Sequence, residues 1–280
     1  MKDFKIGVIT EGFRLPPYDG IRKAAEIGAQ GVQIYTVSGE MGPDMSKEKR
    51  LEIRKLVDSL GLEISALCGD VGGGFANAEA NVEKVALSKR IVDLAVDLGT
   101  HIVTTHIGVT PADRNHPNYK TMLKACRELA DYAATKNVTF AVETGPEKSA
   151  VLKQFLDVID SPGLGVNLDP ANLVMVSADD PVQAVYNLRK YIVHTHAKDG
   201  IQLSAGSAEA VYNAGSKTDA QPVRFKEVPL GEGGVPWPAY LNALDDIGFH
   251  GFLTIEREVG PDPTADIKMA VNFLREQIAK

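Results

Sequence analysis

The sequence predicts an α/β protein built as one (β/α)8 barrel, with residues 1–280 forming a single domain. Eight short strand-like segments alternate strictly with eight helix-like segments along the chain. The stretch after the first strand, ITEGFRLPPYDG, lacks the GxGxxG turn that is typical of an open, doubly wound sheet. No linker or change of composition marks a second domain, and barrels of this length are usually single domains.

The predicted strands are short apolar segments, each followed by a helix-like segment. In chain order they span residues 5–10, 31–36, 62–68, 101–107, 138–144, 164–169, 192–198 and 252–258. A strand followed by a helix is the repeating unit of a parallel barrel. We therefore expect the carboxyl ends of all eight strands to meet at one rim.

The predicted helices fill the intervals between these strands. They span residues 19–28, 47–61, 81–99, 119–137, 150–159, 181–191, 237–248 and 264–280. Several of them end in Gly or Asn, a common stop signal at the C-terminus of a helix: Gly28, Gly61, Gly99, Asn137 and Gly248. One long irregular stretch, residues 200–235, follows the seventh strand, and we expect it at the rim where barrel active sites form.

Composition and charge count against several classes of protein. The chain has 30 Lys and Arg residues against 37 Asp and Glu residues, a net charge of -7, and no basic cluster, so we expect no nucleic-acid partner. No apolar run approaches the roughly 20 residues of a membrane-spanning helix. The start, MKDFKIGVIT, lacks the apolar segment of a signal peptide. We therefore expect a cytoplasmic protein without a membrane partner. The sequence leaves open whether the chain forms a homo-oligomer.

Acidic or imidazole residues stand at the ends of strands five to eight. They are Glu143, Asp169, His196 and Glu256. If the strands lie side by side in a parallel sheet, these four groups converge at one rim. Three carboxylates and one imidazole form a ligand set for a divalent metal, and we predict Mn²⁺ there, with Mg²⁺, Co²⁺ or Zn²⁺ as alternatives. The alternative is that each residue is a solvated strand end or half of an ion pair.

Strand periodicity supports the metal site. In a strand, residues i and i+2 share a face, and the neighbours of each candidate ligand look like apolar residues that face the helices. Each candidate shares the inner face with the residue two positions earlier, respectively Ala141, Asn167, His194 and Thr254. His194 therefore lies one layer deeper, as a core histidine or as a group behind the ligands.

Further polar residues at the same rim are candidates for substrate binding. They are His106, Glu147, Asn172, Lys198 and Glu232. His106 has a structural polar role as its alternative, and Glu147 could instead cap the next helix. Lys198 could stabilise an oxyanion, or it could be an exposed lysine without a role. Glu232 stands in the Gly-rich stretch before the seventh helix.

Five sequence motifs resemble the xylose isomerase-like TIM-barrel superfamily over essentially the whole chain. They are FAVETG, VNLDPANL, VHTHAKD, VPLGEGGVPW and GFLTIERE. In the ketose 3-epimerase branch, the resemblance implies that the same four residues bind the metal. It also implies that Glu143 and Glu256 serve there as the acid/base pair.

The chain departs from the ketose 3-epimerase branch at two positions near these ligands. Asn172 stands where that branch has a histidine, and Gln202 stands where it has an arginine. The motifs HAKD and LGEG look more like the inosose dehydratase branch. The AP-endonuclease branch needs a three-zinc cluster with several more histidines, and the chain has six histidines, mostly misplaced for that cluster.

These observations predict a divalent-metal-dependent isomerase or epimerase that acts on a small sugar, keto-sugar or polyol. The expected reaction is proton transfer by Glu143 and Glu256 through a metal-bound enediolate. The alternative within enzymes is a lyase such as an inosose-type dehydratase. The alternative from another class is a catalytically silent sugar-binding barrel. The sequence leaves open whether the substrate is phosphorylated.

Overall fold

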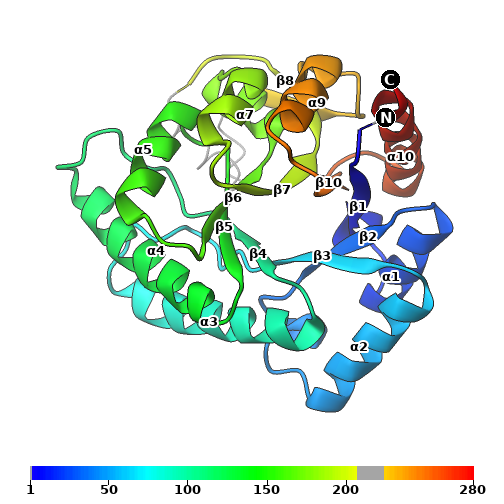
Figure 1. The fold of residues 1–280 in the computed structure, drawn as a ribbon, viewed down its shortest axis with the longest axis horizontal. Coiled ribbons are helices and arrows are strands. Elements are labelled where there is room, and N and C mark those ends of the chain that lie inside the picture. Colours follow the sequence, from blue (N-terminus) through cyan, green and yellow to red (C-terminus); the bar gives the residue numbers. More distant parts are fainter. Residues whose placement is uncertain (1, 207–223) are drawn as a thin grey trace.

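The predicted (β/α)8 barrel is confirmed in the computed structural model, which describes residues 2–206 and 224–280. Parallel strands close into a barrel in the order β1-β10-β7-β6-β5-β4-β3-β2. Helices form a layer outside the strands, and both termini lie beside α10 (Figure 1). The strands are β1 (Lys5–Ile9), β2 (Gly31–Tyr35), β3 (Glu63–Cys68), β4 (Ile102–Thr105), β5 (Thr139–Glu143), β6 (Leu164–Leu168), β7 (Ile192–Ala197) and β10 (Phe252–Ile255).

The outer helices follow the predicted segments to within a few residues. They are α1 (Pro17–Glu26), α2 (Lys47–Ser59), α3 (Ala80–Leu98), α4 (Pro117–Thr135), α5 (Ser149–Ile159), α7 (Pro181–Leu188), α9 (Trp237–Asp246) and α10 (Pro263–Ala279). A short helix α6 (Pro170–Asn172) and a short π-helix (Leu173–Ser177) follow β6 and were not predicted. Within the described ranges, no helix is long and apolar enough to span a membrane.

Local sequence signals explain where several helices begin and end. The predicted stops all have a φ between 55° and 85°, which lies in the left-handed region that ends a helix: Gly28, Gly61, Gly99, Asn137 and Gly248. At the start of α2, the Ser46 side chain accepts a hydrogen bond from the Lys49 N–H. Several helices also begin with proline, which has no N–H to leave unpaired there.

The stretch predicted to be irregular, residues 200–235, is partly ordered into a ribbon. Its two ends pair as antiparallel strands β8 (Asp199–Gln202) and β9 (Phe225–Val228) outside the barrel. The prediction of an irregular loop is therefore wrong for these ends, because Asp199 and Gly200 pair with Val228 and Glu227. The interior of the stretch, residues 207–223, lies outside the described residues.

A buried carboxylate anchors this ribbon to the start of α9. Asp199 Oδ1 accepts from the N–H groups of Gly200 (2.9 Å) and Val235 (3.1 Å). Asp199 Oδ2 accepts from the Gly231 N–H (3.0 Å) and from the Trp237 indole N–H (2.9 Å). A Cβ atom on Gly233 would lie 2.0 Å from Asp199 Oδ1, so the loop passes this carboxylate only where a side chain is missing. Four donors converge on one residue and hold the loop in place.

We expect Asp199→Ala to lower the free energy of unfolding by roughly 3 kcal/mol, because several buried donors would lose their acceptor. Urea unfolding followed by tryptophan fluorescence measures this change directly, since Trp237 is the only tryptophan. Asp245→Ala, on the exposed side of α9, is the matched control and should change stability by less than about 0.5 kcal/mol. Equal effects of the two substitutions would contradict the anchoring role of Asp199.

Candidate metal centre

The four predicted ligands lie together at the carboxyl-terminal rim of the barrel. Glu143 is the last residue of β5, and His196 lies in β7. Asp169 and Glu256 directly follow β6 and β10. These four strands are consecutive neighbours in the barrel, and all four side chains are buried. The predicted convergence is therefore present in the structure.

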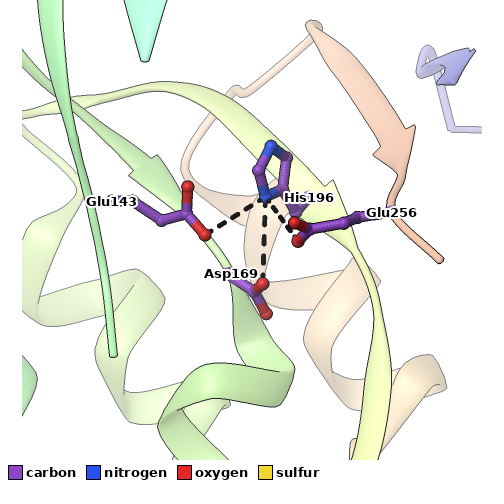
Figure 2. A group of neighbouring side chains, drawn as sticks. All are labelled: Glu143, Asp169, His196 and Glu256. Atoms are coloured by element: carbon purple, nitrogen blue, oxygen red, sulfur yellow. Dashed lines mark ion pairs between the residues drawn. The ribbon is translucent and has the colours of Figure 1, made fainter. Parts of the chain in front are cut away.

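The quartet is compact enough for one ion to contact all of its members. Figure 2 shows the His196 imidazole surrounded by three carboxylates. His196 Nδ1 lies 3.1 Å from Glu256 Oε2, 3.4 Å from Glu143 Oε1 and 3.8 Å from Asp169 Oδ2. One ligand atom from each residue lies within 4.8 Å of all the others. Oxygen ligands at about 2.1 Å from a Mg²⁺ ion are at most about 4.2 Å apart, so little movement would close the site on an ion.

Unsatisfied atoms in the quartet fit a bound cation. Asp169 Oδ2, His196 Nδ1 and Glu256 Oε2 are buried and make no hydrogen bond. Such atoms are rare because burying a polar atom without a hydrogen bond is costly. The other oxygen of Asp169 accepts from the N–H groups of Ala171 (2.8 Å) and Asn172 (3.0 Å) at the start of α6. This cap turns Asp169 Oδ2 toward the other ligands, and the donor set suits a divalent metal.

The second ring nitrogen of His196 is held by a residue on the opposite wall. His196 Nε2 lies 3.2 Å from the side-chain oxygen of Gln33 on β2 and 3.1 Å from the side-chain nitrogen of Asn167. A proton on Nε2 leaves the lone pair on Nδ1, which is the tautomer that a metal ligand needs. His194 lies deeper, 2.9 Å from both Asn167 Oδ1 and Thr254 Oγ1, and burial lowers its pKa well below the usual value. His194 is thus a neutral histidine in the polar core behind the ligands.

The electrostatics of the quartet also favour added positive charge. Burial alone would lower the pKa of His196, but the charges of Glu143 and Glu256 raise it well above its ordinary value. Burial raises the pKa of Asp169. Burial also opposes ionisation of Glu256, but Lys198 and His196 hold its pKa well below the usual range. Three carboxylates in one buried site attract cationic groups from every side.

Two of the predicted substrate-binding residues lie against Glu143. The Asn172 side-chain amide donates to Glu143 Oε1 (3.1 Å), and His106 Nε2 lies 3.4 Å from the same oxygen. The other ring nitrogen of His106 lies 2.9 Å from the carboxylate of Asp70, which follows β3. Burial would lower the pKa of His106, but Glu143 and Asp70 raise it to about 9. A positive charge therefore stands beside Glu143.

Lys198 is buried among carboxylates. Its Nζ lies 2.7 Å from Glu258, 3.3 Å from Glu256 Oε2 and 3.8 Å from Glu227. Glu227 belongs to β9, so the ribbon reaches the candidate metal centre through this carboxylate. The alternative of an exposed lysine is wrong, because only 5% of Lys198 is accessible to solvent. Its contact with substrate stays a prediction.

No hydrogen bond or ion pair joins Glu147 or Glu232 to the quartet in the part of the chain that the structure describes. Glu147 is buried and accepts a hydrogen bond from the Thr110 N–H (3.1 Å). The alternative that Glu147 caps the next helix is wrong, because Ser149 at the start of α5 donates instead to Asp179 (2.7 Å). Glu232 is exposed in the loop before α9. The predicted contacts of both glutamates with substrate stay predictions.

Burial raises the pKa of Glu147 from 4.5 to about 7, which predicts a pH-dependent stability. A raised folded-state pKa stabilises the protein fully below pH 4.5, and this contribution is lost as the pH rises to about 7. The loss is on the order of 3 kcal/mol. We therefore expect Glu147→Gln to gain stability relative to the wild type between pH 5 and pH 8, measured by urea unfolding. Glu276→Gln, an exposed change on α10, is the control, and a pH-independent difference for Glu147→Gln would contradict this expectation.

The sequence reasoning missed four polar residues near the centre: Glu11, Gln33, Asp70 and Glu227. Glu11 and Asp70 lie two residues beyond strand ends, so the rule that found the quartet could have found them. Gln33 is the one polar residue in the segment GVQIY, which is a weaker signal. Glu227 gave no signal, because the pairing of β9 with β8 brings it in across a long sequence separation.

Comparisons with known proteins agree with this fold. The family model described as xylose isomerase-like TIM barrel matches residues 21–277. An L-ribulose-5-phosphate 3-epimerase from Escherichia coli O157:H7 is 23% identical over 248 residues, which cover 85% of this chain and 80% of the relative. A solved xylose isomerase domain protein from Planctomyces limnophilus is 27% identical, with a TM-score of 0.80 over 99% of this chain and 97% of that one.

A second solved structure shares the fold at lower identity. It is a probable 3-DHS dehydratase from Bacillus anthracis, 20% identical, with a TM-score of 0.75 over 97% of this chain and 99% of that one. At such identity the likeness concerns the fold alone. The described fold, the buried quartet and the family model are the observations from which a function can be argued.

Proposed function

Because the chain belongs to the xylose isomerase-like TIM-barrel family, we propose that it is a divalent-metal-dependent enzyme that isomerises or epimerises a small sugar, keto-sugar or polyol. One relative carries the name of a 3-epimerase of a ketose phosphate, which supports an isomerase-class reaction. The proposed ligands are Glu143, Asp169, His196 and Glu256, with Mn²⁺ as the first candidate ion and Mg²⁺, Co²⁺ or Zn²⁺ as alternatives.

The observation that carries this proposal is the placement of Glu143 and Glu256 on different walls of the barrel. Their strands, β5 and β10, are separated by β6 and β7. The imidazole of His196 stands between the two carboxylates (Figure 2). Two carboxylates that approach one site from different directions can remove a proton from one face of a carbon and return one from another. Such an arrangement suits epimerisation as well as transfer between neighbouring carbons.

The neighbours of each glutamate prepare it for this role. Glu143 is oriented by the amides of Asn172 (3.1 Å) and Asn167 (3.2 Å). Glu256 stays ionised because Lys198 lies 3.3 Å from its Oε2. When bound, a divalent ion supplies a Lewis acid that makes the proton next to a carbonyl easier to remove. The two glutamates hold and deliver that proton.

Incorporation of solvent deuterium tests the proposed function. The protein would be incubated in D2O with a panel of ketoses, keto-sugars and inososes and added Mn²⁺, and the sugars followed by NMR. We expect deuterium at a carbon next to the carbonyl, with a product that is an isomer or epimer, and no exchange after EDTA. Exchange that survives EDTA would contradict the metal dependence. A dehydrated product would identify the lyase alternative, and binding without any exchange would identify a silent sugar-binding barrel.

A further inference from the structure

A hollow at the protein surface reaches Glu256, one of the four residues of the candidate metal centre. It has a volume of about 290 Å³, and its lining includes Glu11, Arg14, Tyr35, Glu256 and Glu258. Arg14 is exposed, and 38% of Tyr35 is accessible, so the hollow reaches solvent. Glu256 is 92% buried and turns an oxygen without a hydrogen bond toward the ligand set. The hollow therefore adjoins the site where the proposed reaction takes place, through Glu256.

Glu11 presents a fixed carboxylate in this hollow. Glu11 Oε1 accepts from the Tyr35 N–H (3.2 Å), and Glu11 Oε2 accepts from the Thr10 hydroxyl (2.9 Å). Both donors lie at the ends of barrel strands β1 and β2, so the carboxylate is held on a rigid frame. Each oxygen keeps a second lone pair. Burial raises the pKa of Glu11, and the hydrogen bonds from Thr10 and Tyr35 oppose this rise. The ionised carboxylate accepts hydrogen bonds from sugar hydroxyl groups and repels another anion.

The basic side chains that line or adjoin the hollow are already engaged. Lys198 lies among three carboxylates, with its shortest contact of 2.7 Å to Glu258. Arg257 pairs with Glu227 (2.7 Å) and Asp266 (2.8 Å).

Arg14 uses both terminal nitrogens to donate to backbone carbonyl groups, those of Glu258 (2.9 Å) and Gly260 (3.1 Å). Within residues 2–206 and 224–280, every basic side chain that lines this hollow is thus engaged. A phosphate group that reached the remaining N–H donors of Arg14 would face the carboxylates of Glu11, Glu256 and Glu258 as well.

We propose that the hollow receives an uncharged, hydroxyl-bearing part of the sugar, and that Glu11 selects against a phosphorylated one. The inference rests on the proposed function, because it names the substrate class of the same site. It separates this chain from a relative that is named for a phosphorylated ketose.

Matched pairs of probes test the inference. Calorimetric titration of the Mg²⁺-loaded full chain would compare L-ribulose with L-ribulose 5-phosphate, and D-fructose with D-fructose 6-phosphate. We expect the neutral member to bind at least about tenfold more tightly in each pair that binds. Glu11→Gln keeps one acceptor oxygen but removes the charge, and it should reduce this ratio by about tenfold. Glu63→Gln, in an exposed ion pair at the start of β3, is the control and should leave the ratio unchanged.

Several results would overturn the inference. Tighter or equal binding of the phosphorylated members would do so, and so would a selective loss of their binding in Arg14→Gln, which would mark Arg14 as a phosphate ligand. An unchanged ratio in Glu11→Gln would remove Glu11 as the selecting residue. Failure of the proposed function would show differently, as an absence of metal-dependent deuterium exchange with every sugar, neutral or phosphorylated, in the panel described above.

Discussion

Glu143→Gln and Glu256→Gln are each expected to slow deuterium exchange into the sugar by about 10²–10⁴-fold, the usual contribution of a positioned acid or base. Glutamine keeps the size of the side chain and one oxygen, but it cannot take up the proton. The reason for expecting this of both residues is their placement on separate walls of the barrel, β5 and β10, around His196. Replacing either glutamate would remove either the step that takes the proton from the sugar or the step that returns a proton to it.

The exchange experiment must distinguish a loss of proton transfer from a loss of bound metal. Both variants would be measured at saturating Mn²⁺, with the metal content of each sample determined at the end of the assay. Glu63→Gln, far from the rim in an exposed pair with Lys5, is the control for a glutamate-to-glutamine change and should exchange at the wild-type rate. If both centre variants kept the full exchange rate on an identified substrate, the assigned proton-transfer roles would be wrong.

His196→Ala is expected to weaken Mn²⁺ binding by more than about 100-fold. In other metal sites, mutating a residue that only hydrogen-bonds to a ligand already lowers the metal affinity by about 10- to 100-fold. The variant loses the one nitrogen ligand and leaves three buried carboxylates facing each other. Calorimetric titration of the metal-free protein measures this change without any substrate. Gln33→Leu should weaken binding less, by about tenfold, because it removes only one of the two side chains that contact His196 Nε2.

His101→Ala is the matched control for this experiment. His101 is exposed just before β4, where its ring contacts the Asn137 carbonyl (2.9 Å), and it should not affect metal binding. Wild-type affinity in His196→Ala would remove His196 from the ligand set. Equal losses in Gln33→Leu and His196→Ala would mean that the residues act by holding the barrel together, which thermal unfolding of the two variants would reveal.

The sequence predicts the barrel well because its main signals are local. Alternating strand and helix segments mark the units, and Gly99 or Asn137 end their helices through backbone conformations that can be expected from residue type. The quartet is also local in origin. Each ligand lies within its own strand or directly after it, so parity and the closure of a parallel sheet bring the ligands together.

What the sequence does not predict depends on contacts between distant segments. Lys198 shares parity with His196, but one of its three carboxylate partners, Glu227, reaches it only because β9 pairs with β8. The capping of α5 by Asp179 depends in the same way on where a separate loop returns. Strand periodicity predicts which face of the sheet a side chain occupies. The residues that it contacts there depend on how the barrel closes and where the β8–β9 ribbon lies.

The most direct test of this account is the titration of metal-free protein with Mn²⁺, followed by elemental analysis of the complex. The central claim is that Glu143, Asp169, His196 and Glu256 together bind one divalent ion. The account predicts one Mn²⁺ per chain, bound with release of protons, since His196 must give up its proton to bind the ion. An absence of binding, or a stoichiometry and affinity that stay unchanged in His196→Ala, would contradict it.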